Sequence, residues 1–212
     1  MSWASRAAAN LMPLSVEKDD LGTALTEWEY TGHYEDLGVP SADCELCTHP
    51  DIRYQFEIGN RFTHCKLLVG SECITRFGIS SIDGEGRVLD AEQTGKLVAR
   101  DRRKLIEAAR KRRVVSNLVE LANRDIKFNI LSFIEYISIR GAFTPNQMLL
   151  LIWRFGEHNV NYNIRDFKIT IRRGREKQQL RDAKPWQIEQ LSPLLSPAQK
   201  KFLDSKINEP TG

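Results

Sequence analysis

The chain has 212 residues, of which 41% are apolar, a proportion that is ordinary for a globular protein and sufficient for a core. Its first fifteen residues contain no unbroken apolar run of the length that a signal peptide or a membrane helix needs, so we expect a cytoplasmic protein without a membrane partner. Thiols stay reduced in the cytoplasm, which favours metal ligands over disulfides for the four cysteines.

The charges are distributed unevenly along the chain. Residues 1–95 contain 7 Lys and Arg against 16 Asp and Glu, a net charge of −9, whereas residues 96–212 contain 24 against 12, a net charge of +12. This asymmetry indicates either that the second part binds a polyanion or that the two parts bind each other.

The first segment with a clear pattern is acidic and covers residues 14–43. Asp20 is placed to cap a short helix that extends to Trp28. Acidic residues are interleaved there with aromatic residues that include Trp28, Tyr30 and Tyr34. These aromatic side chains either pack on the segment that follows or anchor a protein partner, and the sequence leaves both interpretations open.

A cysteine-rich segment comes next and holds all four thiols of the chain. Cys44 and Cys47 have the two-residue gap of a zinc knuckle, a tight turn that brings two thiolates to one tetrahedral ion. Cys73 lies where a second knuckle would place another thiolate. The fourth ligand is either Cys65 or His49. Because a site with four protein ligands has no open position for water, the pattern predicts a structural zinc ion.

Two strands are expected between the knuckles. Residues 52–58 alternate apolar with polar side chains, which is typical of a half-buried strand, and after a turn at Asn60 residues 66–70 return antiparallel. Knuckle, hairpin and knuckle together predict a zinc-ribbon or treble-clef-like module. Four free buried thiols are one alternative. A catalytic or redox thiol is another, but neither a Cys, His, Asn order nor a βαβ pattern supports it.

The same segment resembles a set of short zinc-binding proteins of bacteriophages, prophages and other mobile elements. Their motifs appear here as CELC, IRYQFEI and VGSECI, and the resemblance covers residues 38–78, with a weak extension to the TPNQ and WQIEQLSPLLSPAQ segments. In those proteins a histidine near His49 recurs, whereas the position of Cys65 tends not to be cysteine. The resemblance implies a phage- or plasmid-encoded protein of a bacterial cell, but no activity, because this family has none settled.

A long helix is predicted from Ala91 to about Asn123, where apolar residues recur at helical spacing after a capping pair at Asp90 and Gln93. Nine of the residues 96–113 are basic, which exceeds what solubility requires and indicates a phosphate-binding face, although a solvated face is the alternative. The residues predicted to bind nucleic acid on this helix are Arg102, Arg103, Lys104, Arg110, Lys111, Arg112 and Arg113.

More helices are expected in the rest of the chain. The apolar run of residues 126–140 predicts a buried helix that Gly141 ends. Thr144 and Ser196 each precede a proline and a glutamine that complete a capping box, so each opens a helix. Between these two helices, residues 167–171 alternate like a short strand.

A second basic surface is predicted after that strand. Its residues are close together in the sequence: Arg172, Arg173, Arg175 and Lys177. Aromatic residues occur nearby, Trp186 among them, and an aromatic ring beside a guanidinium group can stack on an unpaired base. We therefore predict that this segment also binds nucleic acid.

Together these patterns predict an α+β chain in three parts: an acidic N-terminal arm (1–37), a zinc-binding β module (38–90) and a basic, mainly helical region (91–212). No catalytic motif is visible, so we expect a protein that is not an enzyme. The expected function is nucleic-acid binding, of DNA rather than RNA, through the basic C-terminal surfaces. The alternative is an interaction module that inhibits or modulates a bacterial host or defence protein.

Overall fold

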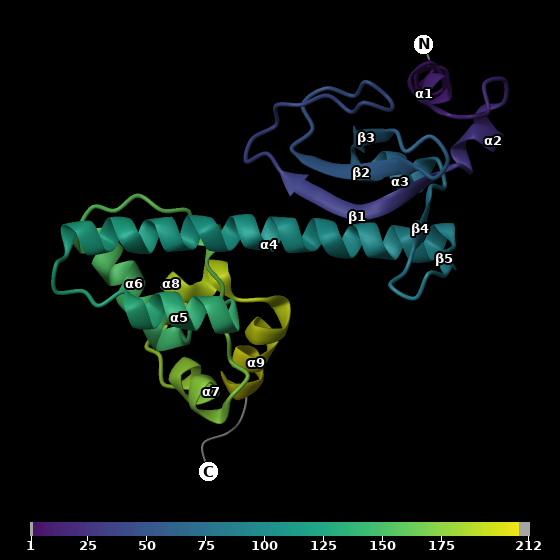
Figure 1. Cartoon of the computed structure of the whole chain (residues 1–212). Coiled ribbons are helices and arrows are strands. Elements are labelled where there is room, and N and C mark those ends of the chain that lie inside the picture. Colours follow the sequence, from purple (N-terminus) through teal and green to yellow (C-terminus); the bar gives the residue numbers. More distant parts are fainter. Residues whose placement is uncertain (1, 208–212) are drawn as a thin grey trace. The chain divides into compact units, whose positions relative to one another are not determined.

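A five-stranded sheet, in the order β3-β2-β1-β4-β5, is built from the first half of the chain (Figure 1). β1 (Trp28–Asp36) lies in its middle, antiparallel to β2 (Tyr54–Asn60) and parallel to β4 (Ser80–Ile82). β3 (Lys66–Val69) and β5 (Val88–Leu89) form the two edges. Because β3 pairs antiparallel with β2, the predicted hairpin is confirmed.

Helices make up most of the remaining chain. The computed structural model describes residues 2–207 of the protein. They are α1 (Trp3–Leu11), η1 (Met12–Leu14), α2 (Leu21–Leu25), α3 (Ser71–Arg76), α4 (Ala91–Arg124), α5 (Leu131–Arg140), α6 (Pro145–Glu157), η2 (Ile164–Asp166), α7 (Gly174–Arg181), α8 (Pro185–Leu191), η3 (Ser192–Leu194) and α9 (Pro197–Ile207). The chain is therefore α+β, as predicted. No helix among the described residues is long and apolar enough to cross a membrane.

The chain divides into two compact units, residues 1–109 and 110–212, and the division falls within α4. This differs from the three predicted parts, because residues 1–37 are not an arm separate from the sheet. They contain β1, the central strand, and the first part of α4 belongs to the same unit as the sheet. Removal of residues 1–37 would therefore remove the middle of the sheet.

Two of the three aromatic residues of the acidic segment are core residues of the first unit, and Tyr34 is partly buried against that core. Trp28 and Tyr30 are buried. Trp28 Nε1 donates a hydrogen bond to Ser15 Oγ at 2.8 Å, and the Tyr30 hydroxyl donates one to Asp101 Oδ2 at 3.2 Å. These two side chains are therefore not available to anchor a protein partner.

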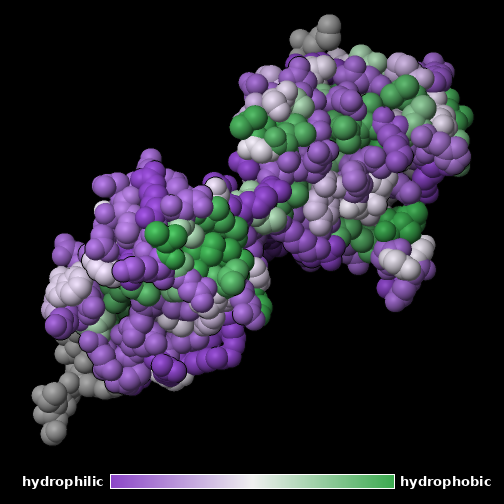
Figure 2. Space-filling model, turned by 60° about the vertical axis from the view of Figure 1, so that its left-hand side comes forward, coloured by the Kyte–Doolittle hydropathy of each residue, from purple (hydrophilic) through white to green (hydrophobic). Residues whose placement is uncertain are grey.

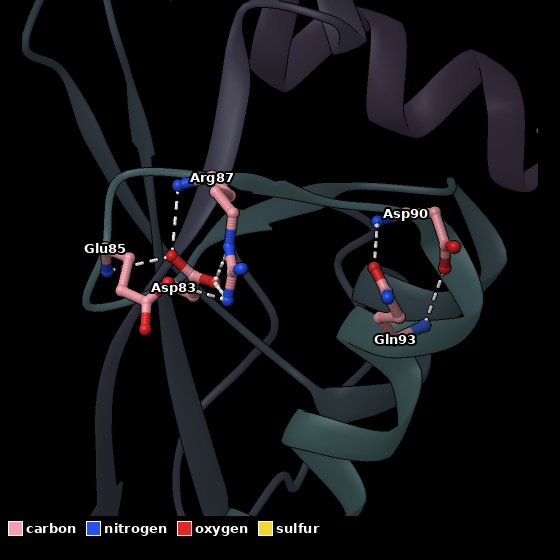
Figure 3. Close-up of polar contacts among 5 residues, drawn as sticks. All are labelled: Asp83, Glu85, Arg87, Asp90 and Gln93. Carbon is pink, nitrogen blue, oxygen red and sulfur yellow. Dashed lines mark hydrogen bonds and ion pairs between the residues drawn. The ribbon is translucent and has the colours of Figure 1, made fainter.

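A tight turn joins β4 to β5, and a capping box starts α4 (Figure 3). Asp83 Oδ1 accepts hydrogen bonds from the N–H groups of Glu85 at 2.9 Å and Arg87 at 3.0 Å, which closes the turn between β4 and β5. Gln93 N donates to Asp90 Oδ1 at 2.8 Å, and Asp90 N donates to Gln93 Oε1 at 3.0 Å. The predicted helix start at Asp90 is confirmed.

Other predicted caps are also present. Thr144 and Ser196 form capping boxes at the starts of α6 and α9. Gly141 ends α5 with a φ of 69°, a left-handed conformation that glycine adopts without strain. Asp20 caps α2, which is shorter than predicted because β1 follows closely. α5 begins at Leu131 and not at residue 126 as predicted, because the chain forms a turn after α4 ends at Arg124.

Aromatic rings fill the core of the second unit. The Phe143 ring centroid lies 6.1 Å from those of both Phe133 and Phe167. The strand predicted at residues 167–171 does not form, since Ile169 makes only an isolated bridge to Phe143. Phe167 and Ile169 are buried among the helices, so their alternation reflects an extended segment that packs its apolar side into a helical core.

Candidate metal centre and basic surfaces

Three cysteine thiols meet at one end of the β2–β3 hairpin. Cys73 Sγ lies 3.6 Å from Cys44 Sγ and 3.3 Å from Cys47 Sγ, and all three side chains are buried. The three sulfur atoms lie within 4.8 Å of one another. Thiolates around a tetrahedral ion with metal–sulfur bonds of about 2.3 Å are about 3.8 Å apart. These cysteines could therefore hold a metal ion.

Backbone hydrogen bonds build the knuckle that carries the first two thiols. Cys44 O accepts from Thr48 N at 2.8 Å, and Cys44 N donates to His49 O at 2.9 Å. Thr48 has a φ of 56°, which closes the turn tightly after Cys47. The two-residue gap therefore places both thiols on one tight turn, as predicted.

The third thiol comes from a helix and not from a second knuckle. Cys73 lies in the first turn of α3, and its N–H donates to Gly70 O at 3.0 Å. The N–H of Gly70 donates to Cys44 Sγ at 3.4 Å. Gly70 thus connects the two halves of the cluster, and the predicted second knuckle is replaced by a helix start.

Helix α1 contacts both halves of the cluster. Arg6 Nε donates to Cys47 O at 2.7 Å. The Trp3 ring stacks on His49 with centroids 6.3 Å apart, and the guanidinium carbon of Arg76, at the end of α3, lies 3.7 Å from the Trp3 ring centroid. No spacing in the sequence links α1 to the cysteines, so sequence analysis missed these contacts.

Neither candidate for the fourth ligand belongs to the cluster, because among the described residues the group of ligand atoms within 4.8 Å of one another consists of the three thiols. His49 lines a cavity of about 340 Å³ that the three clustered thiols also line. Cys65 lies at the other end of β3, and the residues from Cys65 to Gly70 span about 16 Å in extended conformation. Cys65 is therefore too far from the cluster to be a ligand, which corrects one of the two predicted alternatives.

The clustered thiols differ in acidity. Hydrogen bonding with Cys73, with help from backbone N–H groups, lowers the pKa of the Cys44 thiol to about 5. The same contact with Cys44 raises the pKa of Cys73, and burial raises the pKa of Cys47. At neutral pH the metal-free cluster therefore holds one thiolate, Cys44, and two thiols.

This difference predicts the proton balance of metal binding. Because ligand thiols must lose their protons, we expect zinc to release about two protons per ion near neutral pH, from Cys47 and Cys73, and not three. Affinity should then rise by about two log units per pH unit between about pH 7 and 8 and fall as the pH is lowered. Competition with a chelator of known proton affinities measures this slope, and a slope of three would contradict the assignment of Cys44 as the thiolate.

The basic residues predicted on the first part of α4 have local roles. Arg102 lines the cavity beside the thiols. Arg103 Nε donates to Ala99 O at 3.1 Å, and Lys104 Nζ lies 3.2 Å from the buried Asp101 carboxylate. Of these three, Arg102 lines the cavity beside the thiols, and the other two bind atoms of α4 itself.

The second part of α4 uses its arginines to hold the second unit together. Arg110 is only 5% exposed, and its guanidinium donates to Asp166 O and, at 2.6 Å, to Gly141 O. Arg113 pairs with the Asp166 carboxylate at 2.6 and 2.9 Å. Arg110 is therefore a core residue, and its predicted role in binding phosphate is corrected.

The two residues between positions 110 and 113 are also engaged. Lys111 Nζ donates to Ser138 O at 3.1 Å. Arg112 is exposed but has polar or electrostatic contacts of its own. The basic run of α4 therefore offers less charge to a ligand than its composition indicates.

The basic residues predicted near α7 differ from those of α4, because all four are exposed to solvent. We call them the α7 surface: Arg172, Arg173, Arg175 and Lys177. The buried Glu176 fixes the start of α7, because its carboxylate accepts a hydrogen bond from Arg173 N at 3.0 Å. Among the described residues, no hydrogen-bond or ion-pair partner is found for the guanidinium groups of Arg172 and Arg175.

Comparison with known proteins identifies no relative of the chain: no protein-family model, no curated protein and no solved structure matches it. The resemblance to zinc-binding proteins of mobile elements therefore stays a prediction.

Proposed function

We propose that the first unit binds one structural zinc ion through Cys44, Cys47 and Cys73, with His49 as the fourth ligand. Three thiolates and an imidazole form a donor set that suits zinc. The order of knuckle, hairpin and helix start around the thiols supports a treble-clef-like module. Four protein ligands leave no position for water, so this ion would stabilise the unit and take no part in catalysis.

We propose that the second unit binds nucleic acid, DNA in the first instance, through the α7 surface. The observation that supports this most is that Arg172 and Arg175 are exposed and lack an acidic partner among the described residues, whereas Arg113 on α4 is paired with Asp166. Arginine side chains in this state neutralise phosphates and release counterions, which supplies most of the affinity of non-specific DNA binding. This function fits the predicted mobile-element origin.

Charge reversal at the α7 surface tests the proposal. We expect Arg172→Glu to weaken binding of a labelled DNA about tenfold at low salt and to reduce the salt dependence by about one phosphate contact. Fluorescence anisotropy at several salt concentrations measures both quantities. Lys127→Glu is the matched control, because it changes the net charge equally at an exposed position of the same unit. Equal losses in the two variants, or no binding by the wild-type protein, would contradict the proposal.

A second candidate function, interaction with a bacterial host or defence protein, is favoured by exposed apolar side chains of the second unit. Ile126, Leu131 and Ile139 are 97%, 73% and 72% exposed. Figure 2 shows apolar residues at the surface of this unit among mainly hydrophilic ones. A protein captured from nuclease-treated lysate by the wild type and not by Leu131→Asp would favour this candidate over nucleic-acid binding.

A further inference from the structure

A cavity of about 290 Å³ lies beside α7, within the second unit. Residues of α6, of α7 and its end, and of α8 form its wall. The polar residues of the wall are Asn146, Arg175, Gln178, Gln179, Asp182 and Gln187. What the cavity can bind depends on which of their donors and acceptors remain free.

Two carboxamides of the wall are oriented by backbone N–H groups. Gln187 Oε1 accepts from Lys184 N at 2.8 Å, and Gln179 Oε1 accepts from Asn146 N at 3.3 Å. A backbone N–H group can only donate, so the oxygen of each carboxamide must face it. The amino groups of Gln179 and Gln187 then remain as donors, and neither has a hydrogen-bond partner within residues 2–207.

Arg175 adds a positive charge to these two donors. It is exposed, and its guanidinium group has no hydrogen bond or ion pair with another described residue. A guanidinium group presents five N–H donors and keeps its proton at neutral pH. Asp182 brings the opposite charge to the wall, but its Oδ1 already accepts from Gln178 Nε2 at 2.7 Å. The cavity therefore offers free donors from three side chains, one of which is charged.

A terminal phosphate group matches this set of donors. It has three acceptor oxygens and a charge of about −1.5 to −2 at neutral pH, so each of the three donor side chains can bind one oxygen. An internal phosphodiester has two free oxygens and a single negative charge. To place such a group in the cavity, the strand would have to enter the cavity and leave it again. The cavity therefore favours the end of a strand over its interior.

We infer that this cavity binds the terminal phosphate of a nucleic-acid strand whose next phosphates contact the α7 surface. This rests on the proposed nucleic-acid function and narrows it to strand ends. Arg172 and Arg173 lie within three residues of Arg175 in the chain, and these charges suit the phosphates that follow the terminal one. A phosphorylated protein segment offers no such row of phosphates, so the neighbouring arginines favour a nucleic acid.

Anisotropy titrations with strands of one sequence that end in a 5′-phosphate, in a 3′-phosphate or in hydroxyl groups test the inference. We expect the wild-type protein to bind one of the two phosphorylated strands about tenfold more tightly than the hydroxyl-ended strand, a difference of about 1.4 kcal/mol. Gln187→Glu should reduce this preference to less than about twofold, because a carboxylate oxygen replaces the free amino group. The variant keeps an oxygen for Lys184 N, so the start of α8 is preserved.

Gln190→Glu is the matched control. Gln190 is an exposed glutamine of α8 outside the cavity wall, so the change adds the same charge without removing a donor of the cavity. This variant should keep the preference, and the two variants should bind the hydroxyl-ended strand equally well. Gln179→Glu keeps an oxygen for Asn146 N and removes the other amino group, so it should lose the preference as Gln187→Glu does.

Other results overturn the inference and distinguish its failure from that of the proposed function. Equal affinity of the wild-type protein for the three strands, or a preference that survives Gln187→Glu, rejects the phosphate cavity while nucleic-acid binding stands. If no strand binds, the proposed function fails together with the inference. Calorimetry with adenosine monophosphate and with a phosphoserine peptide tests the other sources of a terminal phosphate. Gln187-dependent binding of either one, without a preference among the strands, would assign the cavity to that source and reject strand ends.

Discussion

Replacing Cys73 by serine is expected to lower the zinc content of the purified protein from about one ion per chain to near zero. Cys73 Sγ lies within 3.6 Å of both other clustered sulfur atoms, so its loss leaves two ligands of a knuckle that cannot hold the ion alone. Because apparent binding energies of structural zinc are about 10–16 kcal/mol, the variant should also lose much of the stability of its first unit. Elemental analysis and thermal unfolding measure the two effects.

The control variant is Cys65→Ser. It removes a thiol of the same hairpin that lies at the other end of β3, so we expect it to keep a full zinc content. His49→Ala should bind zinc but release it faster to a chelator, because three thiolates remain. If Cys65→Ser loses zinc and Cys73→Ser keeps it, the proposed ligand set is wrong.

Replacing Arg110 by alanine is expected to lower the free energy of unfolding of the second unit by about 3–5 kcal/mol. The guanidinium group is buried and donates to the carbonyl oxygens of Gly141 and Asp166, which lie on separate segments. Without it, both carbonyl groups lose a charged donor in a site that water does not readily reach. Urea unfolding followed by circular dichroism measures the change.

Arg172→Ala is the comparison for that experiment. It removes an exposed arginine of the same unit, so its effect on stability should be less than about 0.5 kcal/mol. If the Arg110→Ala variant had wild-type stability and a lower affinity for DNA, Arg110 would be a nucleic-acid-binding residue and not a core residue.

The features that the sequence predicted correctly are those that depend on near neighbours. The tight turn that carries Cys44 and Cys47 needs only a two-residue gap, and the capping boxes at Asp90 and Thr144 need only a partner three residues on. The same holds for the turn at Asn60, whose side chain accepts from the N–H groups of the next residues. Hydrogen bonds between residues close in the chain depend on residue types at fixed short spacings, which can be read from the sequence.

The features that it did not predict depend on distant segments. Arg110 has the same neighbours in the sequence as an exposed basic residue, and only the positions of Gly141 and Asp166 make it a core residue. Cys65 is excluded as a ligand by the length of a strand and not by its residue type.

The central position of β1 has a consequence for synthesis on the ribosome. Trp28 pairs with Asn60 and Tyr30 with Ser81, so β1 is made well before either neighbouring strand exists. During that interval both of its edges are open to other nascent chains. Glu29, Glu35 and Asp36 place negative charges along the strand, and like charges keep such edges apart. We expect the acidity of the first segment to disfavour association of nascent chains before the sheet can close.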